Sequence, residues 1–267
     1  MIETIREKVK ETKPLVHCIT NPISIHQCAN TVLAVGARPI MAEHPDEVEE
    51  ITATAKAVLL NLGNITDVRM ESMLRSGRTA KKYQIPVILD AVGAACSRLR
   101  KAFATELLSG GIPTVVKGNY SEIQALYRET YAASGVDAED SLTEEQIRPT
   151  AAALAKRDRC IVLATGKTDL ITDGKQMIFV KNGTPMLTTV TGTGCMLGAL
   201  CASYLTAGKG LYGAAAACGV LGICGELAET GKGSGSFMVS LMDHLSTMSR
   251  EELERNLDME VKEIAGV

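Results

Sequence analysis

The sequence predicts an α/β fold in which a mostly parallel central sheet has helices on both faces and carries an antiparallel edge. Short apolar runs alternate with longer segments of helical period between residues 15 and 165. The runs are apolar throughout, as expected for strands that helices cover on both faces. After residue 165, the dipeptides Asp173-Gly174 and Asn182-Gly183 separate shorter apolar runs and favour hairpin turns.

Six runs are expected to form the parallel strands. They cover residues 15–19, 38–42, 57–62, 86–92, 114–117 and 160–164. Amphipathic helices are expected between them at residues 46–55, 67–83, 99–108 and 143–157. The last of these helices contains Pro149, which could interrupt it.

Three further strands are expected at the antiparallel edge, at residues 170–172, 177–180 and 186–190. Helices rich in Ala and Gly should follow at residues 193–207 and 211–229, with two shorter ones beginning at Phe237 and Arg250. The chain has neither a repeat of fixed period nor a long linker, so residues 1–267 are expected to form a single domain.

The composition narrows the possible partners. The formal charge is -3, and the aromatic residues are six Tyr and three Phe without Trp, which argues against a surface that binds nucleic acid. The longest apolar stretch, residues 211–225, is shorter than the roughly 20 residues of a membrane span. We therefore expect no nucleic-acid partner and no membrane partner.

The eight cysteines favour a reducing compartment. None of them forms a C-x-x-C pair, so their spacing does not indicate a zinc site. Residues 1–13 are charged and amphipathic, unlike an export signal, and the expected location is the cytoplasm.

Polar residues close or follow five of the six predicted parallel strands. Open α/β sheets bind ligands at the carboxyl ends of their strands, so these residues are candidates for a site. Each one could instead cap a helix or fill a turn. The set is His17, Thr20, Asn21, Asn61, Asp90, Lys117, Asn119, Glu122, Thr165 and Gly166.

The strongest local feature is the glycine turn at residues 189–195, which joins a predicted strand to an Ala-rich helix. Its glycines, Gly192 and Gly194, leave backbone N–H groups unobstructed at a helix N-terminus, where a phosphate can bind. The alternative is a tight turn that needs glycine only for its backbone angles. Two common phosphate motifs do not fit: Ile161 stands where a Walker loop ending at Gly166 needs glycine, and Gly198 stands one residue too late for a dinucleotide fingerprint.

Seven motifs in a fixed order carry a family resemblance across nearly the whole chain. They lie at residues 16–21, 36–42, 60–63, 86–93, 117–122, 191–195 and 233–237. Together they resemble the motifs of the hydroxyethylthiazole kinases, which belong to the ribokinase-like superfamily. The resemblance implies a ribokinase-like fold and the transfer of the γ-phosphoryl group of ATP to the primary alcohol of 5-(2-hydroxyethyl)-4-methylthiazole, in thiamine biosynthesis and salvage. It also implies Mg²⁺ and a homotrimer with thiazole sites at subunit boundaries.

The resemblance also implies roles for individual residues. Met41 and Gly192 match positions that bind the thiazole, with Asn21 in the same pocket wall. Lys117, Thr165 and Asn119 are assigned to ATP, and Asp90 and Glu122 to Mg²⁺, through water. Gly192, Thr193, Gly194 and Cys195 would form an anion hole for the transferred phosphoryl group.

Cys195 stands where most ribokinase-like enzymes have an aspartate that can act as a base, so it is either a weak base or part of the pocket wall. Two departures from the family pattern are Lys117, where arginine is frequent, and Ala91, where proline is frequent after the aspartate. The alternatives are a kinase for another small alcohol, an ADP-dependent hydratase-lyase, a nucleotide-binding protein without catalysis and, last, a dehydrogenase.

Overall fold

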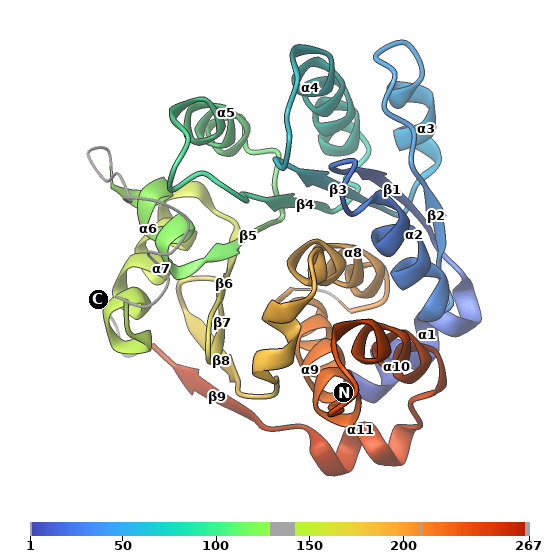
Figure 1. The fold of residues 1–267 in the computed structure, drawn as a ribbon. Helices are drawn as coiled ribbons and strands as arrows, with labels where there is room; N and C mark the ends of the chain where they lie inside the picture. The colour runs from blue at the N-terminus through green and yellow to red at the C-terminus, as the bar shows by residue number, and fades with distance from the viewer. Residues whose placement is uncertain (1, 129–141, 209, 265–267) are drawn as a thin grey trace.

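The computed structural model describes residues 2–128, 142–208 and 210–264. Six parallel strands form most of one sheet, as predicted (Figure 1). They are β1 (Leu15–Ile19), β2 (Arg38–Ile40), β3 (Ala57–Asn61), β4 (Val87–Asp90), β5 (Val115–Asn119) and β6 (Ile161–Thr165). Three antiparallel strands extend it: β7 (Asp169–Thr172), β8 (Gln176–Val180) and β9 (Met259–Glu263). The order is β2-β1-β3-β4-β5-β6-β7-β8-β9.

The antiparallel edge differs from the prediction in its third strand. Residues 186–190, predicted as a strand, lie mostly in a 3₁₀-helix, η2 (Pro185–Thr189), and β9 pairs with β8 instead. The side chain of Asn182 explains the difference, because its Nδ2 donates to the carboxylate of Glu226 and to the carbonyl of Asn256. These bonds direct the Asn-Gly dipeptide toward a helix and not into a hairpin.

Helices cover both faces of the sheet (Figure 1). One face carries α3 (Val48–Thr54), α4 (Asp67–Lys82), α5 (Arg98–Ser109), α6 (Tyr120–Tyr127) and α7 (Glu144–Asp158). The other carries α1 (Ile2–Thr12), α2 (Ile25–Ala34), α8 (Thr193–Leu205), α9 (Leu211–Leu227), α10 (Ser234–Thr247) and α11 (Arg250–Asn256). No helix in the described part of the chain is both long and apolar enough to cross a membrane.

Helix α7 runs through Pro149 without interruption. The proline removes a backbone donor to Glu145, which lies in the first turn, so only one bond near the helix start is lost. A capping box between Thr143 and Gln146 supports the same turn, with each side chain bonded to the other residue's backbone N–H.

Small residues bring α8 close to the centre of the sheet. A Cβ atom at Gly198 would lie 3.1 Å from Cδ1 of Leu59 on β3, so a larger side chain would push the helix away. Helix α8 packs on β3 and β4, and its N-terminus lies at the edge where the parallel strands end. The order of the strands reverses at β1, because β2 lies on one side of it and β3 on the other. Such a switch point is where open α/β sheets bind ligands.

Candidate active site

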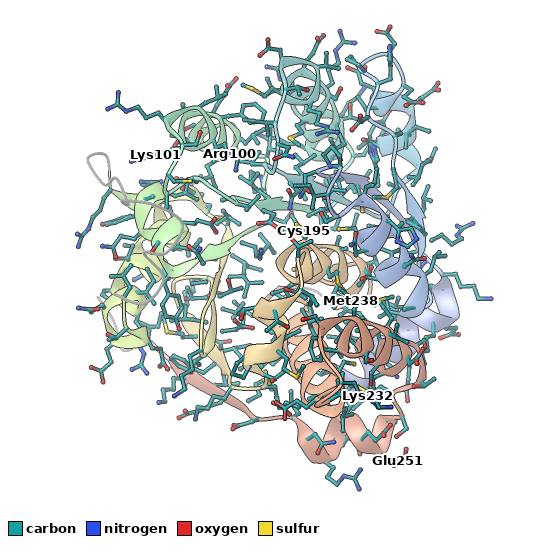
Figure 2. All side chains as sticks on the ribbon, in the orientation of Figure 1. Arg100, Lys101, Cys195, Lys232, Met238 and Glu251 are labelled. Atoms are coloured by element: carbon teal, nitrogen blue, oxygen red, sulfur yellow. The ribbon has the colours of Figure 1, made fainter. Side chains whose placement is uncertain are left out.

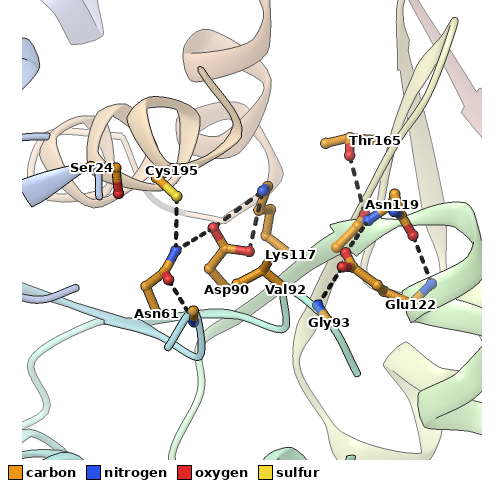
Figure 3. A network of polar contacts seen from close by, with 12 residues as sticks. Ser24, Asn61, Asp90, Val92, Gly93, Lys117, Asn119, Glu122, Thr165 and Cys195 are labelled. Carbon is orange, nitrogen blue, oxygen red and sulfur yellow. Dashed lines mark hydrogen bonds and ion pairs between the residues drawn. The ribbon is translucent and has the colours of Figure 1, made fainter. Parts of the chain in front are cut away.

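Polar side chains from neighbouring strands meet the N-terminus of α8 (Figure 3). Asn61, Asp90 and Lys117 are partners in register on β3, β4 and β5. Asn21 follows β1, and Cys195 lies in the first turn of α8, on the side that faces the strands (Figure 2). The structure thus brings together residues that the sequence placed at separate strand ends.

A buried ion pair occupies the centre of this group. Nζ of Lys117 lies 3.2 Å from each carboxylate oxygen of Asp90, and the two residues are 5% and 0% exposed. Burial raises the pKa of Asp90 above its usual range, against the opposing effects of Lys117 and of the amide of Asn61. Burial lowers the pKa of Lys117, but the negative charges that face it, Asp90 first and then Glu122, together raise it above its usual range. Lys117 is therefore a fixed positive charge.

Two amide side chains connect this pair to α8. Nδ2 of Asn61 donates to Oδ2 of Asp90 at 2.8 Å and to Sγ of Cys195 at 3.4 Å. Nδ2 of Asn21 donates to Oδ1 of Asn61 at 3.1 Å and to the same sulfur at 3.3 Å. The sulfur of Cys195 thus accepts hydrogen bonds from two amides.

The glycine turn faces Lys117. Gly192 is the N-cap of α8 and has a φ of 93°, a conformation that favours glycine. A Cβ atom at Gly194 would lie 3.3 Å from Nζ of Lys117. Thr193 turns away, since its hydroxyl donates to the carbonyl of Leu187. The ammonium group and the first N–H groups of α8 therefore border the same space, which suits an anion.

Glu122 and Asn119 form the capping box of α6. Oδ1 of Asn119 accepts from N of Glu122 at 2.8 Å, and Oε2 of Glu122 accepts from N of Asn119 at 2.7 Å. The other carboxylate oxygen, Oε1, accepts from N of Gly93 at 2.7 Å, which fixes the loop after Asp90. Burial raises the pKa of Glu122 to about 7, with Lys117 opposing. Asn119 and Glu122 therefore do cap a helix, which was the alternative to a role in ligand binding. Each carboxylate oxygen of Glu122 accepts one hydrogen bond and keeps a lone pair for another partner.

Met41 and Thr165 lie at the two ends of the row of parallel strands. Met41 follows β2 and is half-buried, whereas Thr165 ends β6 and donates its hydroxyl to the carbonyl of Gly118. Five strand spacings of about 4.8 Å separate β2 from β6, or about 24 Å. The Asp90–Lys117 pair lies between these ends.

His17, one of the candidate polar residues, faces the loop after β2. Its Nε2 donates to the carbonyl of Ala42 at 2.9 Å, and its Nδ1 lies 2.9 Å from the hydroxyl of Thr52. Burial lowers the pKa of His17, so the ring is neutral at neutral pH. The residue holds the backbone next to Met41 in place.

Sequence reasoning placed Asn61 at a strand end but gave it no role. Its amide is bonded to Asp90, Asn21, Cys195 and the backbone of Gly63. The available signal was its position: Asn61 ends the apolar strand β3, just as Asp90 ends the apolar strand β4.

The chain matches one known protein family over most of its length. The profile of the Hydroxyethylthiazole kinase family matches residues 6–251. The chain belongs to this family. Hydroxyethylthiazole kinase 2 of Clostridium botulinum strain Langeland is 47% identical over 250 residues, which cover 92% of this chain and 94% of the relative. The hydroxyethylthiazole kinase of C. botulinum strain Eklund 17B is 43% identical and covers 91% of this chain and 90% of its own length.

Solved structures agree with this membership of the hydroxyethylthiazole kinase family. A hydroxyethylthiazole kinase protein from Pyrococcus horikoshii OT3 superposes with a TM-score of 0.91 at 34% identity, over 98% of this chain and 99% of the other. A pyridoxal kinase from Staphylococcus aureus, solved with AMP-PCP and pyridoxal, has a TM-score of 0.65 at 15% identity, over 94% and 99%. The second likeness concerns the fold alone. The predicted family and the ribokinase-like fold are both confirmed.

Proposed function

We propose that this protein transfers the γ-phosphoryl group of ATP to the primary alcohol of 5-(2-hydroxyethyl)-4-methylthiazole, in thiamine biosynthesis and salvage. Membership of the hydroxyethylthiazole kinase family over residues 6–251 is the observation that carries the proposal. The anion-binding space between Lys117 and the N-terminus of α8 supports it, because phosphoryl transfer depends on positioning and on charge neutralisation.

In this proposal the thiazole and the nucleotide approach from opposite ends of the strand row. The thiazole binds near Met41, Asn21 and Gly192, on the side of β1 and β2. ATP binds on the side of β5 and β6, near Lys117, Asn119 and Thr165. The separation of about 24 Å between the two outer strands leaves room for an extended nucleotide and a small alcohol with the reacting atoms in the middle.

The transferred phosphoryl group would lie against the glycine turn. Backbone N–H groups of residues 192–195 would stabilise its charge, together with Lys117, whose Nζ lies directly beside the turn. The substrate hydroxyl would lie beside the sulfur of Cys195, which can accept its proton or only orient it. Because phosphoryl transfer passes through a loose transition state, a strong base is not required.

Asp90 and Glu122 fit Mg²⁺ as partners through water. No group of three or more His, Cys, Asp or Glu side chains among the described residues could hold a metal ion by itself. Mg²⁺ is commonly held by one or two carboxylates together with phosphate oxygens and water, and this site offers two carboxylates. When bound with ATP, the ion would neutralise charge on the triphosphate.

We further propose that the chain acts as a single domain in a homotrimer in the cytoplasm. One sheet takes strands from residues 15 to 263, which supports the single domain. The contacting helices α2 and α10 expose Leu33 and Val239, and Ile23 is also exposed close to Asn21, which supports an interface beside the site. The cysteines are free, as in a reducing compartment.

A kinase for another small alcohol is the main alternative. The fold is shared with the pyridoxal kinase of S. aureus, and a fold does not determine the substrate. The test is to incubate the protein with Mg·ATP and a panel of primary alcohols and to identify the phosphate ester by mass. We expect the thiazole alcohol to be the preferred acceptor, with ATP consumed in equal amount. No ester at high enzyme concentration would contradict the proposal.

A further inference from the structure

The amides of Asn21 and Asn61 are each held in one orientation by a backbone N–H group. Oδ1 of Asn61 accepts from N of Gly63 at 2.9 Å, and Oδ1 of Asn21 accepts from N of Ser24 at 3.2 Å. Reversing either amide would set an NH₂ group against a backbone donor. In Asn61 it would also set the amide oxygen against the carboxylate of Asp90. The nitrogen ends are therefore fixed, and both donate to Cys195, as Figure 3 shows for Asn61.

Asn61 uses its whole hydrogen-bonding capacity in this arrangement. One N–H donates to Asp90 and the other to Cys195, while its oxygen accepts from Gly63 and Asn21. The residue is fully buried, so water cannot replace a lost partner without rearrangement. Since an amide nitrogen only donates, the sulfur of Cys195 must accept both bonds.

We propose that Asn21 and Asn61 form a positioning pair that keeps the sulfur of Cys195 a hydrogen-bond acceptor and connects it to the carboxylate of Asp90. Their hydrogen bonds link the first turn of α8 to the ends of β3 and β4 and to the segment that follows β1. Two N–H donors at one sulfur stabilise negative charge on it, and the thiolate is the form that an alkylating reagent attacks.

The consequence for the reaction rests on the proposed kinase function. The two amides occupy two lone pairs of the sulfur. In its thiolate form the sulfur has a third lone pair, which would accept the hydrogen of a substrate hydroxyl and leave an oxygen lone pair free for the phosphorus atom. Asn61 also donates to Asp90, which in turn binds Lys117, so a substitution at Asn61 disturbs both Cys195 and Asp90. Asn61 acts through these neighbours and is a positioning residue.

Alkylation of Cys195 by iodoacetamide tests the pair without using the kinase reaction. The rate constant for Cys195 is measured at pH 7.5 on the full chain by mass spectrometry of its peptide, for wild type, Asn61→Asp and Asn21→Asp. Each substitution replaces an amide NH₂ group by an oxygen and so removes one of the two N–H donors to the sulfur, and we expect the rate constant to fall at least fivefold. The exposed Cys96 gives an internal reference for the reagent.

Asn182→Asp is the matched control. Its amide also donates to two half-buried partners, Glu226 and Asn256, but it belongs to the junction after β8. This variant can melt at a lower temperature, yet its Cys195 rate constant should stay within twofold of wild type. For Asn61→Asp we also expect kcat to fall at least tenfold while KM for ATP changes less than threefold.

Rate constants within twofold of wild type in both folded active-site variants overturn the proposal. If Asn61→Asp does not fold, Asn21→Asp decides by the same criterion. If the wild type forms no phosphate ester, the proposed function is wrong, but the alkylation rates still test whether Asn21 and Asn61 act on the sulfur of Cys195.

Discussion

Nζ of Lys117 lies 3.2 Å from both carboxylate oxygens of Asp90, and the two residues are partners in register on β5 and β4. On its other side Asp90 is the register partner of Asn61 on β3. Parallel neighbours lie about 4.8 Å apart, so three polar side chains in register at the strand ends come into contact. The pairing of the strands therefore builds the centre of the site.

Asp90→Asn and Glu122→Gln should each lower kcat at least tenfold, equivalent to about 1.4 kcal/mol of transition-state stabilisation. Each change removes a carboxylate charge that we assign to Mg²⁺ and the triphosphate. The measurement is a Mg²⁺ titration of kcat at saturating ATP and alcohol. Kinetics that match wild type across the titration would exclude the assigned role.

Lys117→Met should destabilise the fold by about 3 to 5 kcal/mol, because it leaves the carboxylate of Asp90 buried without its partner. Adding Asp90→Asn to this variant should recover much of the loss, since no buried charge then remains. Urea unfolding of the two single variants and the double variant measures this coupling. A double variant whose losses simply add would show that the pair contributes little to stability.

The parallel part of the sheet could be predicted because its strands are short, apolar runs bounded by turn residues. Strand β9 could not be predicted in the same way. Its sequence, Met259–Glu263, is mostly charged and partly exposed, and its partner Gln176 lies far away along the chain. Helix α6 was also not predicted, although Asn119 and Glu122 have the spacing of a capping box.

The site was predicted as a set of residues but not as a set of contacts. Asp90 and Lys117 stand at strand ends in the sequence, which gives the edge of the sheet on which they lie. The sequences of β3 and β4 do not determine the register between the two strands, so the contact of Asn61 with Asp90 could not be predicted. The glycine of positive φ is Gly192, whereas Gly194 is needed for space beside Lys117.

Asp169→Asn should change how stability depends on pH. Burial raises the pKa of Asp169 to about 6, although N of Gly166 donates to the carboxylate. Between the unfolded pKa, near 4, and about 6 the folded protein binds more protons, so wild-type stability falls as pH rises through this window. The asparagine variant lacks this loss and should gain up to about 3 kcal/mol relative to wild type between pH 4 and pH 7. Denaturant unfolding at both pH values checks the difference, and an unchanged difference would contradict it.

The protein should be a trimer at concentrations where it is active. Leu33 and Val239 are 56% and 63% exposed, and their burial between subunits would stabilise the assembly. Light scattering coupled to size exclusion gives the mass. A monomer with full activity would contradict the proposal, because sites at subunit boundaries do not survive dissociation. Val239→Lys should weaken assembly, whereas Tyr83→Lys, on the exposed end of α4 across the sheet, should not.

Gly194→Ala should reduce kcat more than Cys195→Asp. A methyl group at Gly194 would lie 3.3 Å from Nζ of Lys117 and occupy the space assigned to the phosphoryl group. Backbone strain is not the reason, since the positive φ belongs to Gly192. The kcat values at saturating Mg·ATP decide the order.

Cys195→Ala should keep measurable activity, with a loss no larger than the roughly 10² to 10⁴ that removal of a general base causes. In a loose transition state the proton leaves late, so a base contributes little. Cys195→Asp should be tolerated or faster, because Asn21, Asn61 and the N-terminus of α8 all present N–H donors to an acceptor at this position. If Cys195→Asp were inactive while Gly194→Ala was nearly normal, the sulfur would act as a nucleophile or a specific ligand. The anion hole at the glycine turn would then not be the source of catalysis.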